Sequence, residues 1–146
     1  MTRASPDPTL SVSIRRTFKA SRERVFRAWT DPEVLPKWFR PMGMETTVSY
    51  LELRIGGAYR FDYRAPDGER RAVTGKYLEI VRPEKLVFTW VSDATNDEET
   101  RVTVEFRDLG GSTEVILTHQ LLADENMVYR HQQGWASVLD QLENAL

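Results

Sequence analysis

The chain has 146 residues, of which 40% are hydrophobic and 29% charged. These proportions are typical of one soluble globular domain, which at this length buries about 70% of its extended-chain surface. The net charge of −2, with acidic residues diluting the arginine clusters, argues against a nucleic-acid partner, and the absence of cysteine excludes disulfides, thiolate metal ligands and thiol catalysis.

The first nine residues lack the apolar run of a signal peptide, so we expect a flexible tail over 1–9 and a single domain over 10–146. No stretch of the chain approaches the length of a membrane span. We therefore expect a cytoplasmic protein with no membrane contact, as a monomer or homodimer.

A strand and two short helices are predicted first. Alternating apolar and polar residues predict a strand over 10–18. Ser21 is a suitable N-cap for a helix that carries Val25, Phe26 and Trp29 at helical spacing. Asp31, followed by Pro32 and Glu33, predicts a second helix capped at Asp31 that extends to Trp38 and Phe39.

Six strands are predicted next, because alternating segments are separated by turn residues. The short connections make consecutive strands antiparallel neighbours. The connection over 92–98 is acidic, and we expect it to be an exposed, mobile loop. The predicted strands are 44–54, 58–64, 70–81, 85–91, 99–107 and 112–120.

The strand over 58–64 is the most informative of these. Tyr59, Phe61 and Tyr63 alternate strictly with charged residues, which predicts one aromatic and one charged face. A purely structural core uses Val, Ile and Leu more often, so three consecutive rings favour a surface that receives a ligand. Aromatic core packing is the alternative.

A long helix is predicted over 124–145, about 33 Å in length at 1.5 Å per residue. Its apolar stripe recurs at steps of three and four. Gly134 interrupts this helix at a cost of about 1 kcal/mol, and we expect a close neighbour at that point to explain it. The stripe consists of Val128, His131, Trp135, Val138 and Leu142.

Several motifs occur in the order found in one family, over nearly the whole chain. They are Ala20-x4-Val25-Phe26-x2-Trp29-Thr30-Asp31-Pro32, Trp38-Phe39, Gly56-Gly57 with the aromatic strand and Pro66-Asp67-Gly68, Gly75-x-Tyr77-x-Glu79-Ile80, Pro83-Glu84-x-Leu86-x-Phe88-Thr89-Trp90, Thr118-His119 and His131-x2-Gly134-Trp135-x3-Leu139-x2-Leu142.

In these motifs the chain resembles the bacterial homologues of the C-terminal domain of the heat-shock-protein-90 ATPase activator. That family lies within the helix-grip superfamily of START domains, birch-pollen-allergen relatives and polyketide cyclases. The resemblance implies an α+β helix-grip fold, in which a curved antiparallel sheet of six to seven strands wraps around a long C-terminal helix. It implies an activity only weakly, because the superfamily hosts many functions.

We expect a small, mainly hydrophobic ligand beneath the C-terminal helix, in a slot where Trp135 faces Phe61 and Trp90 and which suits a sterol or polyketide. A chaperone-interacting protein of the stress response and a polyketide cyclase-like enzyme are the alternatives. The predicted ligand-binding residues are Trp38, Tyr59, Phe61, Tyr63, Tyr77, Phe88, Trp90, His119, His131 and Trp135.

His119 and His131 are both expected to point inward. They could form a proton-transfer pair, or each could hydrogen-bond a buried group. The carboxylates of Glu52, Asp62 and Glu79 are expected in ion pairs or on a solvated face. No catalytic residue, metal ion or cofactor is predicted, because two histidines without cysteine make a poor metal site and no phosphate-binding loop is present.

Overall fold

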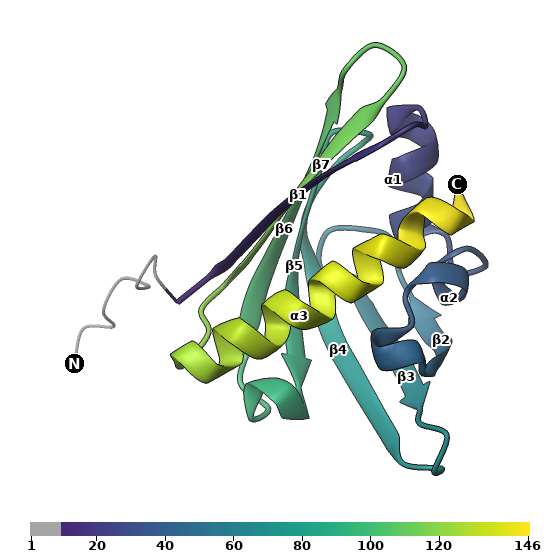
Figure 1. The fold of residues 1–146 in the computed structure, drawn as a ribbon. Coiled ribbons are helices and arrows are strands. Elements are labelled where there is room, and N and C mark those ends of the chain that lie inside the picture. Colours follow the sequence, from purple (N-terminus) through teal and green to yellow (C-terminus); the bar gives the residue numbers. More distant parts are fainter. Residues whose placement is uncertain (1–9) are drawn as a thin grey trace.

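Seven antiparallel strands form a single curved sheet in the computed structural model, which describes residues 10–146 (Figure 1). The predicted tail over 1–9 lies outside the described residues. The sheet order is β1-β7-β6-β5-β4-β3-β2, so the last strand of the chain, β7, returns to pair with the first, β1. The strands are β1 Val12–Phe18, β2 Glu45–Leu51, β3 Ala58–Arg64, β4 Arg70–Val81, β5 Lys85–Ser92, β6 Thr100–Asp108 and β7 Thr113–Gln120.

Helices cover one face of this sheet, as expected of a helix-grip fold. The helix α3 crosses the sheet diagonally, and α1 and α2 lie together near its C-terminal end (Figure 1). The sheet therefore has a concave side, where the core forms, and a convex side that faces solvent. The helical segments are α1 Arg22–Thr30, α2 Leu35–Trp38, α3 Glu125–Leu142 and the 3-10 turns η1 Pro41–Gly43, η2 Asp93–Thr95 and η3 Glu143–Ala145.

The start of the second helix differs from the prediction. Ser21 caps α1 as expected, since its side chain accepts a hydrogen bond from the Arg24 amide. Asp31 instead ends α1, and its Oδ1 accepts from the Glu33 amide at 2.9 Å in an Asx turn. The regular helix begins only at Leu35, after a turn in which the Asp31 carbonyl accepts from the Val34 and Leu35 amides, each at 3.0 Å.

The segment over 92–98 is also more ordered than the predicted mobile loop. Residues Asp93–Thr95 form the 3-10 turn η2, and Thr95 is buried. The Thr95 hydroxyl lies within hydrogen-bond distance of the carbonyl oxygens of Ser92 and Glu98, at 3.0 and 2.8 Å, which share its one proton, and it accepts from the Ser92 amide. These bonds fold the connection back against the end of β5.

Aromatic side chains of β3 point to the concave side, as the alternation predicts. Tyr59, Phe61 and Tyr63 are all buried. Opposite them on β4, Gly75 pairs with Tyr59, and the Tyr59 hydroxyl reaches across that glycine to donate to the Thr89 carbonyl at 2.5 Å. A Cβ at Gly75 would lie 2.0 Å from that carbonyl oxygen, so only glycine lets the tyrosine cross β4.

The helix α3 buries one stripe against the sheet. It is shorter than predicted, at 18 residues or about 27 Å. The Asp124 side chain caps it by accepting a hydrogen bond from the Met127 amide. Met127 rather than Val128 begins the buried stripe. Among the described residues, no helix is both long and apolar enough to cross a membrane.

Candidate functional site

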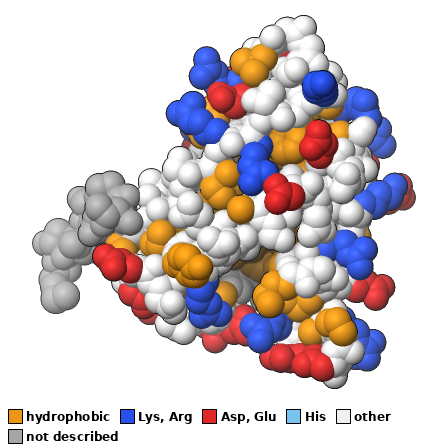
Figure 2. All heavy atoms as spheres, viewed as in Figure 1, with side chains coloured by type: hydrophobic (Ala, Val, Ile, Leu, Met, Phe, Trp, Pro, Cys, Tyr) orange, Lys and Arg blue, Asp and Glu red, His pale blue; other side chains and the backbone are white. Residues whose placement is uncertain are grey.

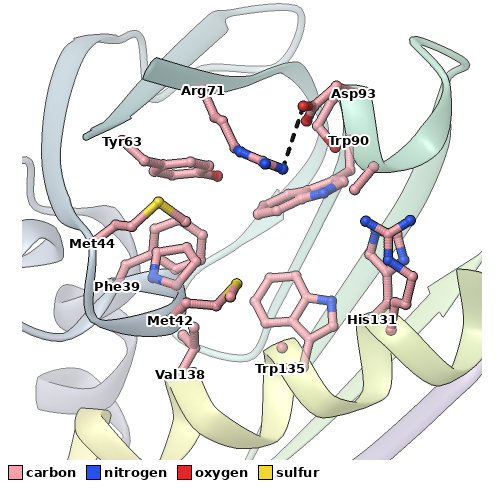
Figure 3. A pocket seen from close by; sticks show the side chains of 15 residues that line it. Phe39, Met42, Met44, Tyr63, Arg71, Trp90, Asp93, His131, Trp135 and Val138 are labelled. Carbon is pink, nitrogen blue, oxygen red and sulfur yellow. Dashed lines mark ion pairs between the residues drawn. The ribbon is translucent and has the colours of Figure 1, made fainter. Parts of the chain in front are cut away.

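A cavity of about 190 Å³ opens between the middle of α3 and the end of the sheet formed by β3, β4 and β5 (Figure 3). It is bordered by the two 3-10 turns η1 and η2, which approach α3 from either side of the sheet end. Its lining residues are Phe39, Pro41, Met42, Met44, Tyr63, Arg71, Trp90, Ser92, Asp93, Ala94, Arg130, His131, Gly134, Trp135 and Val138.

Gly134 contributes open space to this cavity. A Cβ built on Gly134 meets no atom within 4 Å outside its own stretch of helix. The prediction of a close neighbour at this glycine is therefore wrong. The missing side chain leaves room beside Trp135 and Val138. The helix tolerates the glycine because buried residues before and after it hold α3 against the sheet.

The inner wall of the cavity is aromatic. Trp90 of β5 and Trp135 of α3 contact each other, with ring centroids 4.9 Å apart. Phe39 lies against both, at 5.8 and 6.1 Å, and against Phe61 at 5.4 Å. The expected slot between Trp135 and Phe61 is therefore occupied by Phe39, and the open space lies on the other side, toward Tyr63 and the turns.

The ten predicted ligand-binding residues divide into three sets. Tyr63, Trp90, His131 and Trp135 line the cavity. His119 is buried behind Trp135. The remaining five surround a void of only about 20 Å³, which is the space of one water, and these are Trp38, Tyr59, Phe61, Tyr77 and Phe88.

His119 has a partner for each ring nitrogen. The Trp135 indole N–H donates to its Nδ1 at 3.0 Å, so the proton of the neutral ring is on Nε2. That Nε2 lies 2.7 Å from the Thr100 hydroxyl, which in turn donates to the Trp90 carbonyl at 2.6 Å. Burial holds the pKa of His119 well below its usual value, so the ring is neutral near pH 7.

His131 is held differently, on the cavity side of α3. Its Nδ1 lies 2.8 Å from the Met127 carbonyl one turn earlier, so Nδ1 carries the proton and donates. Burial is the main cause that lowers the pKa of His131, although the bond to Met127 opposes it. In the neutral ring Nε2 is an acceptor, and it has no hydrogen-bond partner among residues 10–146.

Charged side chains stand at the mouth of the cavity. Arg71 extends over it from β4, and its Nη1 lies 3.5 Å from an Asp93 carboxylate oxygen in η2 (Figure 3). Its Nη2 lies 3.0 Å from Glu69 Oε1. Arg130 of α3 lines the other side. Over the rest of the visible surface, charges of both signs are interspersed (Figure 2).

The charged mouth and the residues of η1 were not predicted from the sequence. Met42 is 85% exposed and has a φ of +54°, a left-handed conformation that a non-glycine residue adopts rarely. Met42 and Met44 line the cavity beside Phe39, and Met42 lies next to Val138 of α3 (Figure 3). The signal for Arg71 was present, since alternation in β4 places it on the same face as Val73.

The candidate acidic residues form surface ion pairs. Glu52 pairs with Arg54 and Asp62 with Arg60, as expected, and Glu79 pairs with Lys85. Within the described part of the chain, no three His, Asp or Glu side chains are grouped as metal ligands would be. The chemistry of the site is therefore that of an aromatic cavity with polar groups at its rim.

Comparisons with known proteins identify the relatives of this chain. The family model described as "Activator of Hsp90 ATPase homolog 1-like protein" matches residues 19–146. A solved structure of a protein from Chromobacterium violaceum is 29% identical, with a TM-score of 0.84 over 92% of this chain and 95% of the other. The structure of the AHSA1 protein from Silicibacter pomeroyi is 26% identical, with a TM-score of 0.81 over 92% and 95%. No curated protein matches this sequence at a significant level.

Proposed function

The chain belongs to the Activator of Hsp90 ATPase homolog 1-like family, and on that premise we propose that it binds a small, mainly apolar molecule. The observation that supports this proposal is the cavity of about 190 Å³ between α3 and the sheet. Its wall is made by rings of Phe39, Tyr63, Trp90 and Trp135, and apolar walls with a few polar groups are typical of ligand sites.

The volume of the cavity limits the size of the ligand. A buried apolar cavity of about 150 Å³ holds one benzene molecule, whereas cavities for drug-sized ligands measure about 300–1,000 Å³. We therefore propose a ligand with one ring or a short branched chain in the cavity. A sterol or a polyketide of several fused rings would need the space that Phe39 occupies.

Binding without turnover is the activity that the two histidines support. A general acid–base pair needs rings that can exchange protons with a substrate. His119 has both nitrogens engaged, by Trp135 and Thr100, and faces no open space. Of the two histidines, His131 borders the cavity, and its Nδ1 donates a hydrogen bond to the Met127 carbonyl. We propose that His131 orients the ligand as a hydrogen-bond acceptor.

The binding experiment uses toluene and indole as neutral probes. Both should shift the indole N–H signals of Trp90 and Trp135 in two-dimensional NMR spectra of the labelled protein, because these rings line the cavity. Gly134→Leu would place a side chain in the cavity and should abolish the shifts. Gln133→Leu adds the same side chain on the exposed face of α3 and should leave them unchanged.

Two outcomes would contradict the proposal. Unchanged spectra at saturating probe would show that the cavity takes no apolar molecule. Turnover of small aromatic or polyketide substrates that disappears in His131→Gln would establish an enzyme, for which a loss of about 10²–10⁴ in rate is expected.

A protein partner is the second candidate, since the family description names a chaperone activator. Leu53, Ile55 and Leu78 are exposed apolar side chains, and the Gly56 amide ties their loop to β4 by donating to the Tyr77 carbonyl. Exposed apolar side chains that gather in one region favour protein contacts. For this candidate, the protein should raise the ATPase rate of an Hsp90-type chaperone, and Ile55→Ser should reduce that effect. An unchanged chaperone rate would refute it.

A further inference from the structure

Two arginines border a cavity whose remaining walls are mostly apolar. Arg71 follows the alternation of β4 onto the concave face, where its neighbours in the same row are Val73 and Gly75. A charged residue in such a row must reach toward water or an opposite charge. Arg71 does so at the mouth of the cavity, with its guanidinium beside Tyr63 and Trp90 (Figure 3).

The acidic groups near the mouth are already engaged by Arg71. Asp93 and Glu69 each approach a different terminal nitrogen of its guanidinium, at 3.5 and 3.0 Å. Asp93 is the only carboxylate that lines the cavity, among residues 10–146. A guanidinium has five N–H donors, so the two contacts leave donors of Arg71 available to a third acceptor.

Arg130 supplies a second cation without a counter-ion. It lies on the turn of α3 that carries His131, and its side chain makes no ion pair or hydrogen bond within the described part of the chain. His131 beside it is neutral. Arg130 and the spare donors of Arg71 therefore face the mouth from opposite elements, α3 and β4, and the two nearby carboxylates, Asp93 and Glu69, both contact Arg71 and not Arg130.

We propose that the cavity selects ligands that join a single aromatic ring to one negatively charged group, such as a carboxylate. This inference rests on the proposed binding function and specifies the ligand class. The ring lies against Trp90 and Trp135, and the carboxylate remains at the mouth, where it accepts hydrogen bonds from Arg130 and Arg71. Charge-assisted bonds of this kind are about twice as strong as neutral ones.

The opposite charge preference is disfavoured by the same contacts. An aromatic wall can also hold a cation by cation–π contact. A cationic head group at this mouth would meet Arg130 and Arg71, and the one lining carboxylate, Asp93, is already paired. The structure therefore favours an anionic head group over an ammonium of the same shape.

The test compares three probes of nearly equal size: benzoate, benzyl alcohol and benzylammonium. Binding is followed by the Trp135 indole signal in NMR titrations, because ligands of eight or nine non-hydrogen atoms bind with Kd values on the order of 0.1–1 mM. We expect benzoate to bind about tenfold more tightly than benzyl alcohol, and benzylammonium to bind most weakly. Benzenesulfonate, an anion of different geometry, shows whether the charge or the planar carboxylate is recognised.

Arginine variants identify the source of the preference. Arg130→Gln and Arg71→Gln should each raise the Kd of benzoate about tenfold and that of benzyl alcohol by a clearly smaller factor, because a neutral hydroxyl gains less from a guanidinium than a carboxylate does. Arg101→Gln removes the same charge from an exposed position on β6, outside the cavity, and should change neither value. Unfolding curves of each variant confirm that it is folded before titration.

The outcomes separate this inference from the proposed function. Equal affinity for benzoate and benzyl alcohol, or an effect of Arg101→Gln as large as that of Arg130→Gln, would refute charge selection and leave apolar binding intact. Tighter binding of benzylammonium would reverse the assignment. Failure of all probes, toluene and indole included, would refute both proposals.

Discussion

Alanine at Gly134 should stabilise the protein. The substitution removes the cost of glycine inside a helix, about 1 kcal/mol. No steric penalty opposes this gain, because the added Cβ has no neighbour within 4 Å beyond its own helix. For a chain of this length, the gain corresponds to a rise in Tm of about 3 °C.

Leucine at the same position should stabilise the protein further, because its side chain would fill part of the cavity. It keeps most of the propensity gain and buries apolar surface against Trp135 and Val138, which adds about 1–2 kcal/mol. The expected rise in unfolding free energy is therefore about 2–3 kcal/mol. Affinity for toluene should disappear in the same variant, so stability and binding change in opposite directions.

Urea unfolding followed by tryptophan fluorescence measures these differences, with Gln133→Leu as the control for a leucine on the exposed side of α3. A packed interface at Gly134 would instead give a loss of about 1–3 kcal/mol for leucine. Such a loss, with toluene binding retained, would refute the description of Gly134 as open space.

Three further predictions concern the core behind the cavity. Gly75→Ala should lower the unfolding free energy by about 1–3 kcal/mol, because its Cβ would lie 2.0 Å from the Thr89 carbonyl oxygen and 2.5 Å from the Tyr59 ring. Thr100→Val should cost about 1–3 kcal/mol, since the buried His119 Nε2–H would lose its acceptor. Stability should be constant above about pH 7 and fall below pH 6.5, by up to about 1.4 kcal/mol per pH unit for each of His119 and His131, as measured by urea unfolding between pH 5 and 8. The reason is that the unfolded His119 takes up a proton near its ordinary pKa of 6.5, whereas the folded ring has a much lower pKa and stays neutral.

Each of these predictions has a control. Thr103→Val replaces a threonine of β6 that lies between the inward positions Val102 and Val104, and should stay within about 0.5 kcal/mol of wild type. His119→Gln should reduce the slope, and the part that persists is expected from His131, whose pKa is also lowered by burial. An unchanged slope in this variant would assign the pH dependence to other groups. A neutral result for Gly75→Ala would show that Tyr59 can move aside.

The strands could be predicted from the sequence because their signals are local. The bounds of β3 and β4 are those predicted, since alternation and turn residues lie within each segment. The inward orientation of Tyr59 and Phe61 followed from the same alternation. The family resemblance then supplied the position of α3 over the sheet.

The predictions that were wrong depend on interactions between distant segments, or on local interactions that compete with one another. Asp31 could cap a helix or close an Asx turn, and its sequence neighbours suit both. Gly134 in a helix indicates either close contact or open space, and only the residues opposite decide which. The cavity could not be located because Phe39, from a segment almost a hundred residues before α3, occupies the expected slot.

Phe39 divides the space under α3 into a packed part and an open part, and this division has an evolutionary consequence. The walls of the open part come mainly from two short turns, η1 and η2, and one stretch of α3. Substitutions there leave the aromatic cluster around Tyr59 intact. The shape and charge of the open part can therefore vary among relatives while the folded frame stays the same, and under the proposed binding function a protein engineer could vary the same few positions to change the ligand.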